Sequence, residues 1–202
     1  MAKNNILKKI VSAVTGTVIA ASLGTAVYLA SYRSPEHKKL QKAGIVEKQA
    51  TVGEVTFNYA EGPDNGTPLI LLHAQLLDWF TYSKVLPALS ENFHVYAIDY
   101  PAHGKTTYPA DYEMSADNIG ASLKQFIQEV IGEPVFVTGN SSGGLLTAWL
   151  AANAPDMVKA VVLEDPPLFS SEYPEIQKTI AYRSFTTSEK ALKEGYHDDF
   201  LM

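Results

Sequence analysis

The chain has 202 residues, of which 46% are hydrophobic and 10% aromatic, and it contains no cysteine. This apolar content excludes wholesale disorder and is enough for one sizeable core, while the lack of cysteine excludes disulfides, thiolate metal sites and cysteine catalysis. The formal net charge of -6 gives no basic surface of the kind that binds phosphate backbones, so we expect no nucleic-acid partner.

The N-terminal segment differs from the rest of the chain. Residues 10–32, IVSAVTGTVIAASLGTAVYLASY, carry no charge and follow a basic flank, residues 1–9, that contains Lys3, Lys8 and Lys9. A helix of this length can cross a hydrocarbon core of roughly 30 Å, which predicts a single transmembrane anchor. The alternatives are a cleavable signal sequence, with small residues near Gly24 as the cleavage site, and a core helix of a soluble protein.

The positive charges around this segment lie on both sides of it. Basic residues also follow it closely, so the positive-inside rule does not firmly select an orientation. We expect the N-terminus inside the cytoplasm and the globular part outside, with the membrane as a partner; secretion after cleavage is the alternative. Residues 33–44 are charged and polar, which predicts a linker or a short helix.

From Ile45 the pattern becomes one of alternating strands and helices. Residues 45–66 alternate apolar and polar and end in turn residues, which predicts two antiparallel strands. Continuous apolar runs predict buried strands at 68–73, 94–99, 134–139 and 159–165. Apolar residues at helical spacing predict helices at 79–90, from Ser115 to Gly132 and at 143–153. Residues 45–168 therefore predict an α/β fold with a mostly parallel sheet and flanking helices.

After Asp165 this alternation stops. Residues 169–202 begin with a loop and then predict two short helices, the second opening with a capping box at Thr186 and Glu189 and ending near Gly195. No further apolar strand follows in the sequence. We interpret this part as the start of a helical cap.

One motif at the end of a predicted strand carries chemistry. Residues 139–143, GNSSG, match the pattern G-x-S-x-G between a strand and a helix. The glycines permit a tight turn that exposes the central residue, and a helix N-terminus favours developing negative charge. Ser141 is therefore the candidate nucleophile, and Ser142 would contribute its backbone N–H. The alternative is a glycine-rich helix start that serves close packing.

Three segments in this order resemble the α/β-hydrolase superfamily: LILLHAQLLDW, DYPAHGKT and GNSSGG. The resemblance implies an oxyanion hole formed by the backbone N–H groups of Gln75 and Ser142, an acyl-enzyme mechanism and a small ester-like substrate, with no cofactor and no metal. Ala74 and Ala102 stand where the family usually has glycine. The serine at position 141 argues against the dehalogenase and epoxide-hydrolase branches, which have aspartate there.

The general base is the least defined part of the predicted site. A serine nucleophile needs an imidazole, and the imidazole needs a carboxylate that orients it. In the family the order is serine, acid, histidine, and the only histidine after Ser141 is His197, in the predicted cap. Asp165, at the end of the last predicted strand, is the candidate acid. We therefore expect a fragment or an interrupted gene product that lacks the final strands and the base.

The sequence thus predicts, for the intact form, an esterase-like serine hydrolase. Two alternatives stay open, which are a catalytically inactive, membrane-anchored binding module and a haloperoxidase-like or carbon–carbon bond hydrolase. Neither the substrate nor the oligomeric state is specified by the sequence.

Overall fold

The computed structural model of the protein describes residues 35–168 and 174–194. It divides into two compact units, one ending at Pro166 and the other beginning at Pro167. The basic flank at 1–9 and the anchor predicted at 10–32 lie outside the described residues. Among the residues that are described, none of the helices combines the length and the apolar character needed to cross a bilayer.

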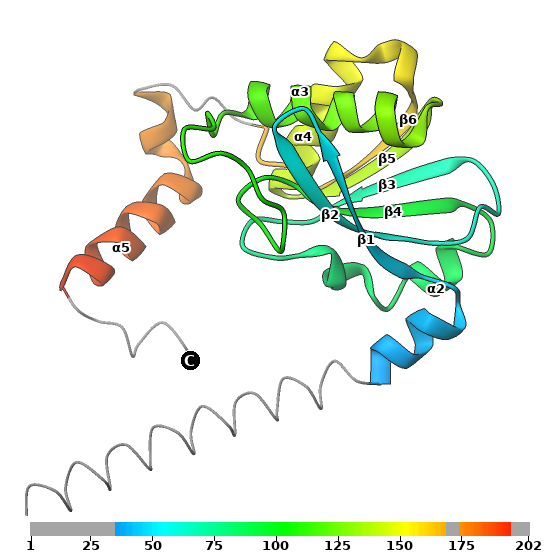
Figure 1. Cartoon of the computed structure of the whole chain (residues 1–202). Coiled ribbons are helices and arrows are strands. Elements are labelled where there is room, and N and C mark those ends of the chain that lie inside the picture. Colours follow the sequence, from blue (N-terminus) through cyan, green and yellow to red (C-terminus); the bar gives the residue numbers. More distant parts are fainter. Residues whose placement is uncertain (1–34, 169–173, 195–202) are drawn as a thin grey trace, which may run out of the picture. The chain divides into compact units, whose positions relative to one another are not determined.

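The first unit is built on a six-stranded sheet in the order β1-β2-β4-β3-β5-β6 (Figure 1). The strands are β1 (Val46–Val52), β2 (Val55–Glu61), β3 (Pro68–Leu72), β4 (His94–Asp99), β5 (Val135–Asn140) and β6 (Val158–Glu164). β1 and β2 form the predicted antiparallel hairpin, and β2 also pairs antiparallel with β4. The other four strands pair in parallel, which confirms the mostly parallel sheet.

Helices cover both faces of the sheet. α3 (Ala116–Phe126), its π-helical continuation η2 (Ile127–Ile131) and α4 (Ser142–Asn153) lie on one face, where the buried core contains Leu123, Phe126 and Leu150. A helix over residues 35–42, the 3-10 turn η1 (Trp79–Tyr82) and α2 (Leu86–Leu89) supply a second buried cluster with Leu40 and Leu86. The predicted α/β architecture is therefore present, with a core on each side of the sheet.

Helix α3 begins where the sequence predicted it. The Ser115 hydroxyl oxygen accepts a hydrogen bond of 3.2 Å from the backbone N–H of Asn118, which satisfies one of the free N–H groups of the first turn. After η2 the chain turns at Gly132, which has a left-handed φ of 77°. A further 3-10 turn, η3 (Pro155–Met157), leads from α4 into β6.

The single helix predicted at 79–90 is wrong. The Asp78 carboxylate accepts a bond of 3.1 Å from the Phe80 N–H and starts η1, which ends after one turn. The one-turn helix α2 follows, with Pro87 in its first turn. Because proline has no N–H, it cannot extend a helix that began earlier, but it fits the first turn of a new one.

In the part that the structure describes, the second unit contains the helices η4 (Glu175–Lys178) and α5 (Ile180–Glu194). The capping box predicted at Thr186 is wrong, because α5 starts earlier, where the Thr179 hydroxyl oxygen accepts a bond of 3.1 Å from the Tyr182 N–H. The Thr186 hydroxyl instead donates a bond of 2.8 Å to the Tyr182 carbonyl oxygen inside the helix. The predicted helix end near Gly195 and the histidine at 197 lie outside the described residues.

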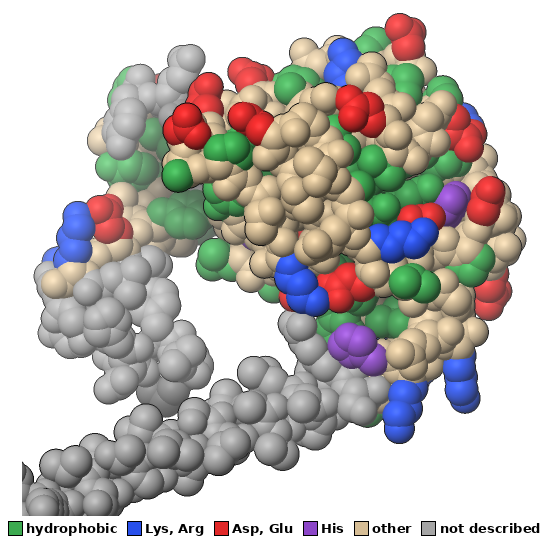
Figure 2. Space-filling model, in the orientation of Figure 1, with side chains coloured by type: hydrophobic (Ala, Val, Ile, Leu, Met, Phe, Trp, Pro, Cys, Tyr) green, Lys and Arg blue, Asp and Glu red, His purple; other side chains and the backbone are tan. Residues whose placement is uncertain are grey.

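The visible surface is mixed in character. On the face drawn in Figure 2, acidic and basic side chains are interspersed with apolar ones and do not gather into one large basic area. Within the first unit, β6 stands at the end of the sheet order and pairs with β5 alone. Its side chains Val161, Val162 and Leu163 are exposed, Val162 to 61%.

Candidate functional site

The turn between β5 and α4 holds Ser141 in a strained conformation. Its φ is 51° and its ψ is -114°, a region that residues other than glycine rarely enter. The Ser141 N–H donates a bond of 2.8 Å to the carbonyl oxygen of Glu164, the last residue of β6. The serine therefore stands at the tip of a sharp strand-to-helix turn, at the N-terminus of α4.

Two glycines let α4 start directly against the sheet. A Cβ on Gly143 would collide with the carbonyl oxygens of Leu72 and His73 at the end of β3. A Cβ on Gly139 would collide with the Gly143 carbonyl and with the Thr147 side chain. Both positions need glycine because backbone approaches backbone too closely for any side chain.

The loop that carries Gln75 follows the neighbouring strand. β3 pairs in parallel with β5, and Leu72 lies opposite Gly139, so the loop after β3 and the turn at Ser141 leave the sheet at the same edge. The Leu77 N–H donates a bond of 3.2 Å to the Ala74 carbonyl oxygen, which closes a turn around Gln75. Gln75 is exposed, and Leu76 next to it is 88% exposed with φ 64°.

A buried carboxylate ties several segments together beside this loop. Asp99, the last residue of β4, is 1% exposed. Its oxygens accept bonds from the Trp79 N–H at 2.7 Å, the Asn58 side-chain amide at 2.8 Å and the Lys105 N–H at 3.1 Å. Gly104 leaves room for the carboxylate, which a Cβ there would overlap. Asp99 is not among the predicted site residues, although a charge that ends a buried strand is a usable signal.

Two histidines, His73 and His103, are buried beside the same strand ends. His73 is fully buried, and its Nδ1 lies 2.8 Å from the Ala74 carbonyl oxygen, which assigns the proton to Nδ1. Burial lowers the pKa of His73, against the raising effects of the Ala74 carbonyl and of Asp99, whose carboxylate oxygen is 3.8 Å from Nε2. His103 places Nδ1 3.1 Å from the Pro101 carbonyl oxygen. Nδ1 of each ring therefore lies at hydrogen-bond distance from a backbone carbonyl oxygen, and both histidines are buried parts of the scaffold.

The candidate acid stands at the end of β6. Asp165 is exposed and has φ 49°, so the chain turns sharply there. The carboxylate of the preceding Glu164 accepts a bond of 2.7 Å from the Thr138 hydroxyl on β5. The structure thus brings Ser141, Ser142, Gln75 and Asp165 to the strand ends on one edge of the sheet, and the role of Asp165 stays a prediction.

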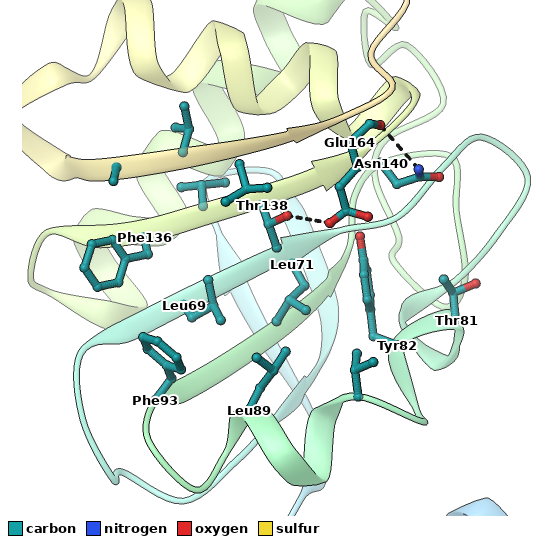
Figure 3. A pocket seen from close by; sticks show the side chains of 15 residues that line it. Leu69, Leu71, Thr81, Tyr82, Leu89, Phe93, Phe136, Thr138, Asn140 and Glu164 are labelled. Carbon is teal, nitrogen blue, oxygen red and sulfur yellow. Dashed lines mark hydrogen bonds between the residues drawn. The ribbon is translucent and has the colours of Figure 1, made fainter.

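A cavity of about 710 Å³ opens on the sheet face between α2 and β6 (Figure 3). Its polar end carries Thr138, Asn140, Glu164 and Tyr82, while the rest is apolar and includes Leu69, Leu89, Phe93, Phe136 and Val162. Asn140 directly precedes Ser141, but Ser141 does not line the cavity. Because the cavity lies along the strands and not above their ends, it is not assigned as the ester site.

A smaller cavity of about 500 Å³ lies beside the Gln75 loop. Leu76, Leu77 and Phe80 contribute apolar surface to it, and Asp78 and Lys84 contribute charge. Across the described parts of the chain, no group of three or more histidine, aspartate and glutamate side chains could hold a metal ion.

Residues 67–200 match the family model described as the alpha/beta hydrolase fold. The chain belongs to this family. A serine hydrolase-like protein from Homo sapiens is 24% identical over 125 residues, which are 61% of this chain and 62% of that protein. A pimeloyl-[acyl-carrier protein] methyl ester esterase from Neisseria meningitidis serogroup A is 31% identical over 103 residues, 50% of this chain and 30% of the esterase.

The fold is also similar to that of a solved bacterial protein described as a membrane phospholipase A. The TM-score is 0.63 at 25% identity, and the match covers 76% of this chain and 51% of that one. The chain therefore spans less than two thirds of the relatives it matches.

Proposed function

We propose that this chain carries the nucleophile half of a serine hydrolase that cleaves small ester-like substrates through an acyl-enzyme at Ser141. The observation that carries the proposal is the conformation of Ser141, with φ 51° between a buried strand and a helix N-terminus. Such strain persists where the surrounding structure enforces it, and it is concentrated at reactive sites. The names of the relatives, a serine hydrolase-like protein and two ester hydrolases, support the same chemistry.

The proposed reaction has two halves. The Ser141 hydroxyl oxygen attacks the ester carbonyl carbon, its proton passes to a general base, and the negative charge collects on the carbonyl oxygen. The backbone N–H groups of Gln75 and Ser142 donate to that oxygen. The alcohol leaves with a proton, and water then releases the acid and restores Ser141. We assign the base to neither His73 nor His103, because both are buried and hold Nδ1 against a backbone carbonyl oxygen.

We also propose where this chemistry takes place. The uncharged segment 10–32 would anchor the chain, with the globular part outside the cytoplasm. The exposed side chains of Leu76 and Leu77 directly follow Gln75 and suit the apolar part of an ester. An anchored hydrolase with apolar residues beside its site would meet substrates that partition into membranes, in keeping with the relative described as a membrane phospholipase A.

A fluorophosphonate probe tests the nucleophile directly. The natural full-length protein, tested in membranes of the cells that express it, should become labelled by the probe. The substitution Ser141→Ala in that protein should abolish the labelling. Ser122→Ala, which removes a hydroxyl on α3, serves as the matched control and should label like the wild type. If a folded wild-type protein is not labelled, or if the Ser141→Ala variant is still labelled, the acyl-enzyme proposal is wrong and a binding role is favoured.

A further inference from the structure

Tyr100 connects two elements that are not neighbours in the sheet. It directly follows β4, is 2% exposed, and lies one strand away from β5 because β3 stands between them. Its phenolic oxygen nevertheless lies 2.9 Å from the hydroxyl oxygen of Ser142, the first residue of α4. The tyrosine therefore reaches under the end of β3 to the start of the helix.

The ring of Tyr100 also contacts the end of β3 itself. It stacks on the imidazole of His73 with ring centroids 4.6 Å apart and planes 19° apart. His73 in turn bonds through Nδ1 to the Ala74 carbonyl oxygen at 2.8 Å, next to Gln75. One buried side chain thus touches both segments that carry the proposed oxyanion donors: the loop of Gln75 through its ring, and Ser142 through its hydroxyl group.

We propose that Tyr100 is a positioning residue that sets the separation between the backbone N–H groups of Gln75 and Ser142. This inference rests on the proposed function, since the separation matters only if the two groups bind one oxyanion. Donors of this kind act through their fixed placement, and a misplacement of about 1 Å can cost about 100-fold in rate. In this proposal the effect of Tyr100 passes through its contacts with Ser142 and His73.

The chain offers a closely matched control pair. Tyr112 is also buried, at 7% exposure, and its hydroxyl lies 2.9 Å from the Ser122 hydroxyl on α3, away from the strand ends. Burial raises the pKa of both tyrosines, and in both the bond to serine opposes that shift. Removing either hydroxyl therefore breaks the same kind of tyrosine–serine bond, but only one of the two bonds reaches α4.

The experiment compares Tyr100→Phe, Ser142→Ala and their double variant with Tyr112→Phe in the full chain. With p-nitrophenyl butyrate as the probe, we expect Tyr100→Phe to lower kcat by about tenfold while KM changes less than twofold. The double variant should be no slower than the slower single variant, because both substitutions break one bond. Tyr112→Phe should lower the melting temperature to a similar extent and leave kcat unchanged.

A second measurement decides the inference even if the wild type does not turn over the ester. Amide hydrogen exchange in the segment 139–146 should accelerate severalfold in Tyr100→Phe and Ser142→Ala, and not in Tyr112→Phe. Wild-type inactivity together with that local acceleration would count against the proposed function, and it would leave standing only that Tyr100 fixes the start of α4. Unchanged exchange in Tyr100→Phe, or a kcat loss equal to that of Tyr112→Phe, would overturn the positioning role.

Discussion

The backbone N–H of Ser141 donates a 2.8 Å hydrogen bond to the carbonyl oxygen of Glu164. The last residue of β6 therefore holds the turn that follows β5, and the Ser141 side chain makes no cap bond to α4. The hydroxyl is thereby kept out of the bonding that fixes the turn. Its placement depends on the backbone of two adjacent strands.

The strain at Ser141 predicts how replacements will rank in stability. Alanine keeps the positive φ and its steric conflict, whereas glycine relieves it. We expect Ser141→Gly to exceed Ser141→Ala in free energy of unfolding by about 1 kcal/mol, after the greater flexibility of glycine in the unfolded chain is included. Urea denaturation of the two variants measures the difference. Equal stabilities, or a more stable alanine variant, would show that the turn is not strained.

The close approach of α4 to β3 predicts a severe effect of Gly143→Ala. The added methyl group would meet the backbone oxygens of Leu72 and His73, which cannot move aside without shifting the strand end. We expect a loss of about 3 kcal/mol in the free energy of unfolding. Gly132→Ala is the comparison, because a Cβ there meets nothing within 4 Å and only the positive φ opposes it. That variant should lose about 1 kcal/mol, and a larger loss there would contradict the close-approach argument.

The buried His73 predicts a pH dependence of stability. Burial lowers the pKa of His73, and the neighbouring His103 lowers it further. The Ala74 carbonyl and the carboxylates of Asp99 and Asp78 act in the opposite direction and raise the pKa, but burial is the largest effect. As the pH falls through the unfolded value of 6.5, the unfolded chain takes up a proton that the native ring does not. The free energy of unfolding should therefore fall from about pH 7 to pH 5. Urea titrations at several pH values measure this, and His73→Gln should remove part of the slope. An unchanged slope in that variant would assign the effect to another group.

The exposed apolar strand β6 predicts self-association. An unpaired strand edge with apolar side chains can pair with a strand of another chain, and a charged side chain on the edge prevents that pairing. Val162→Lys should reduce self-association, which sedimentation velocity measures. It should change the free energy of unfolding by less than about 0.5 kcal/mol. Val46→Lys, on the opposite edge strand and 53% exposed, is the matched control. An equal reduction by both substitutions would point to a general charge effect.

The strands and long helices could be predicted because their apolar patterns are strong. The run at 68–73 and the capped helix after Ser115 appear in the structure close to their predicted limits. Apolar spacing alone does not distinguish two short turns from one helix, so it does not predict the break within 79–90, although Pro87 indicates it. The early start of α5 is not evident in the sequence, because the capping-box pattern at Thr186 and Glu189 is stronger than the single threonine at position 179 that caps the helix.

The candidate site was predictable only where a local motif carries it. The turn at Ser141 follows from glycines within five residues, so sequence spacing sufficed. The contacts of Tyr100 and Asp99 join residues far apart in the chain, and they depend on the strand order, which places β3 between β4 and β5. Such side-chain partners become visible only once the sheet is assembled.

The bonds of Asp99 give the site one shared anchor. β2, η1 and the loop at Lys105 each donate a hydrogen bond to the same buried carboxylate. These segments therefore have no independent positions, because displacing one changes the acceptor geometry for the other two. The segments around the candidate site should therefore move together. Loss of the bond from Asn58, on a strand away from Ser141, should also displace Trp79.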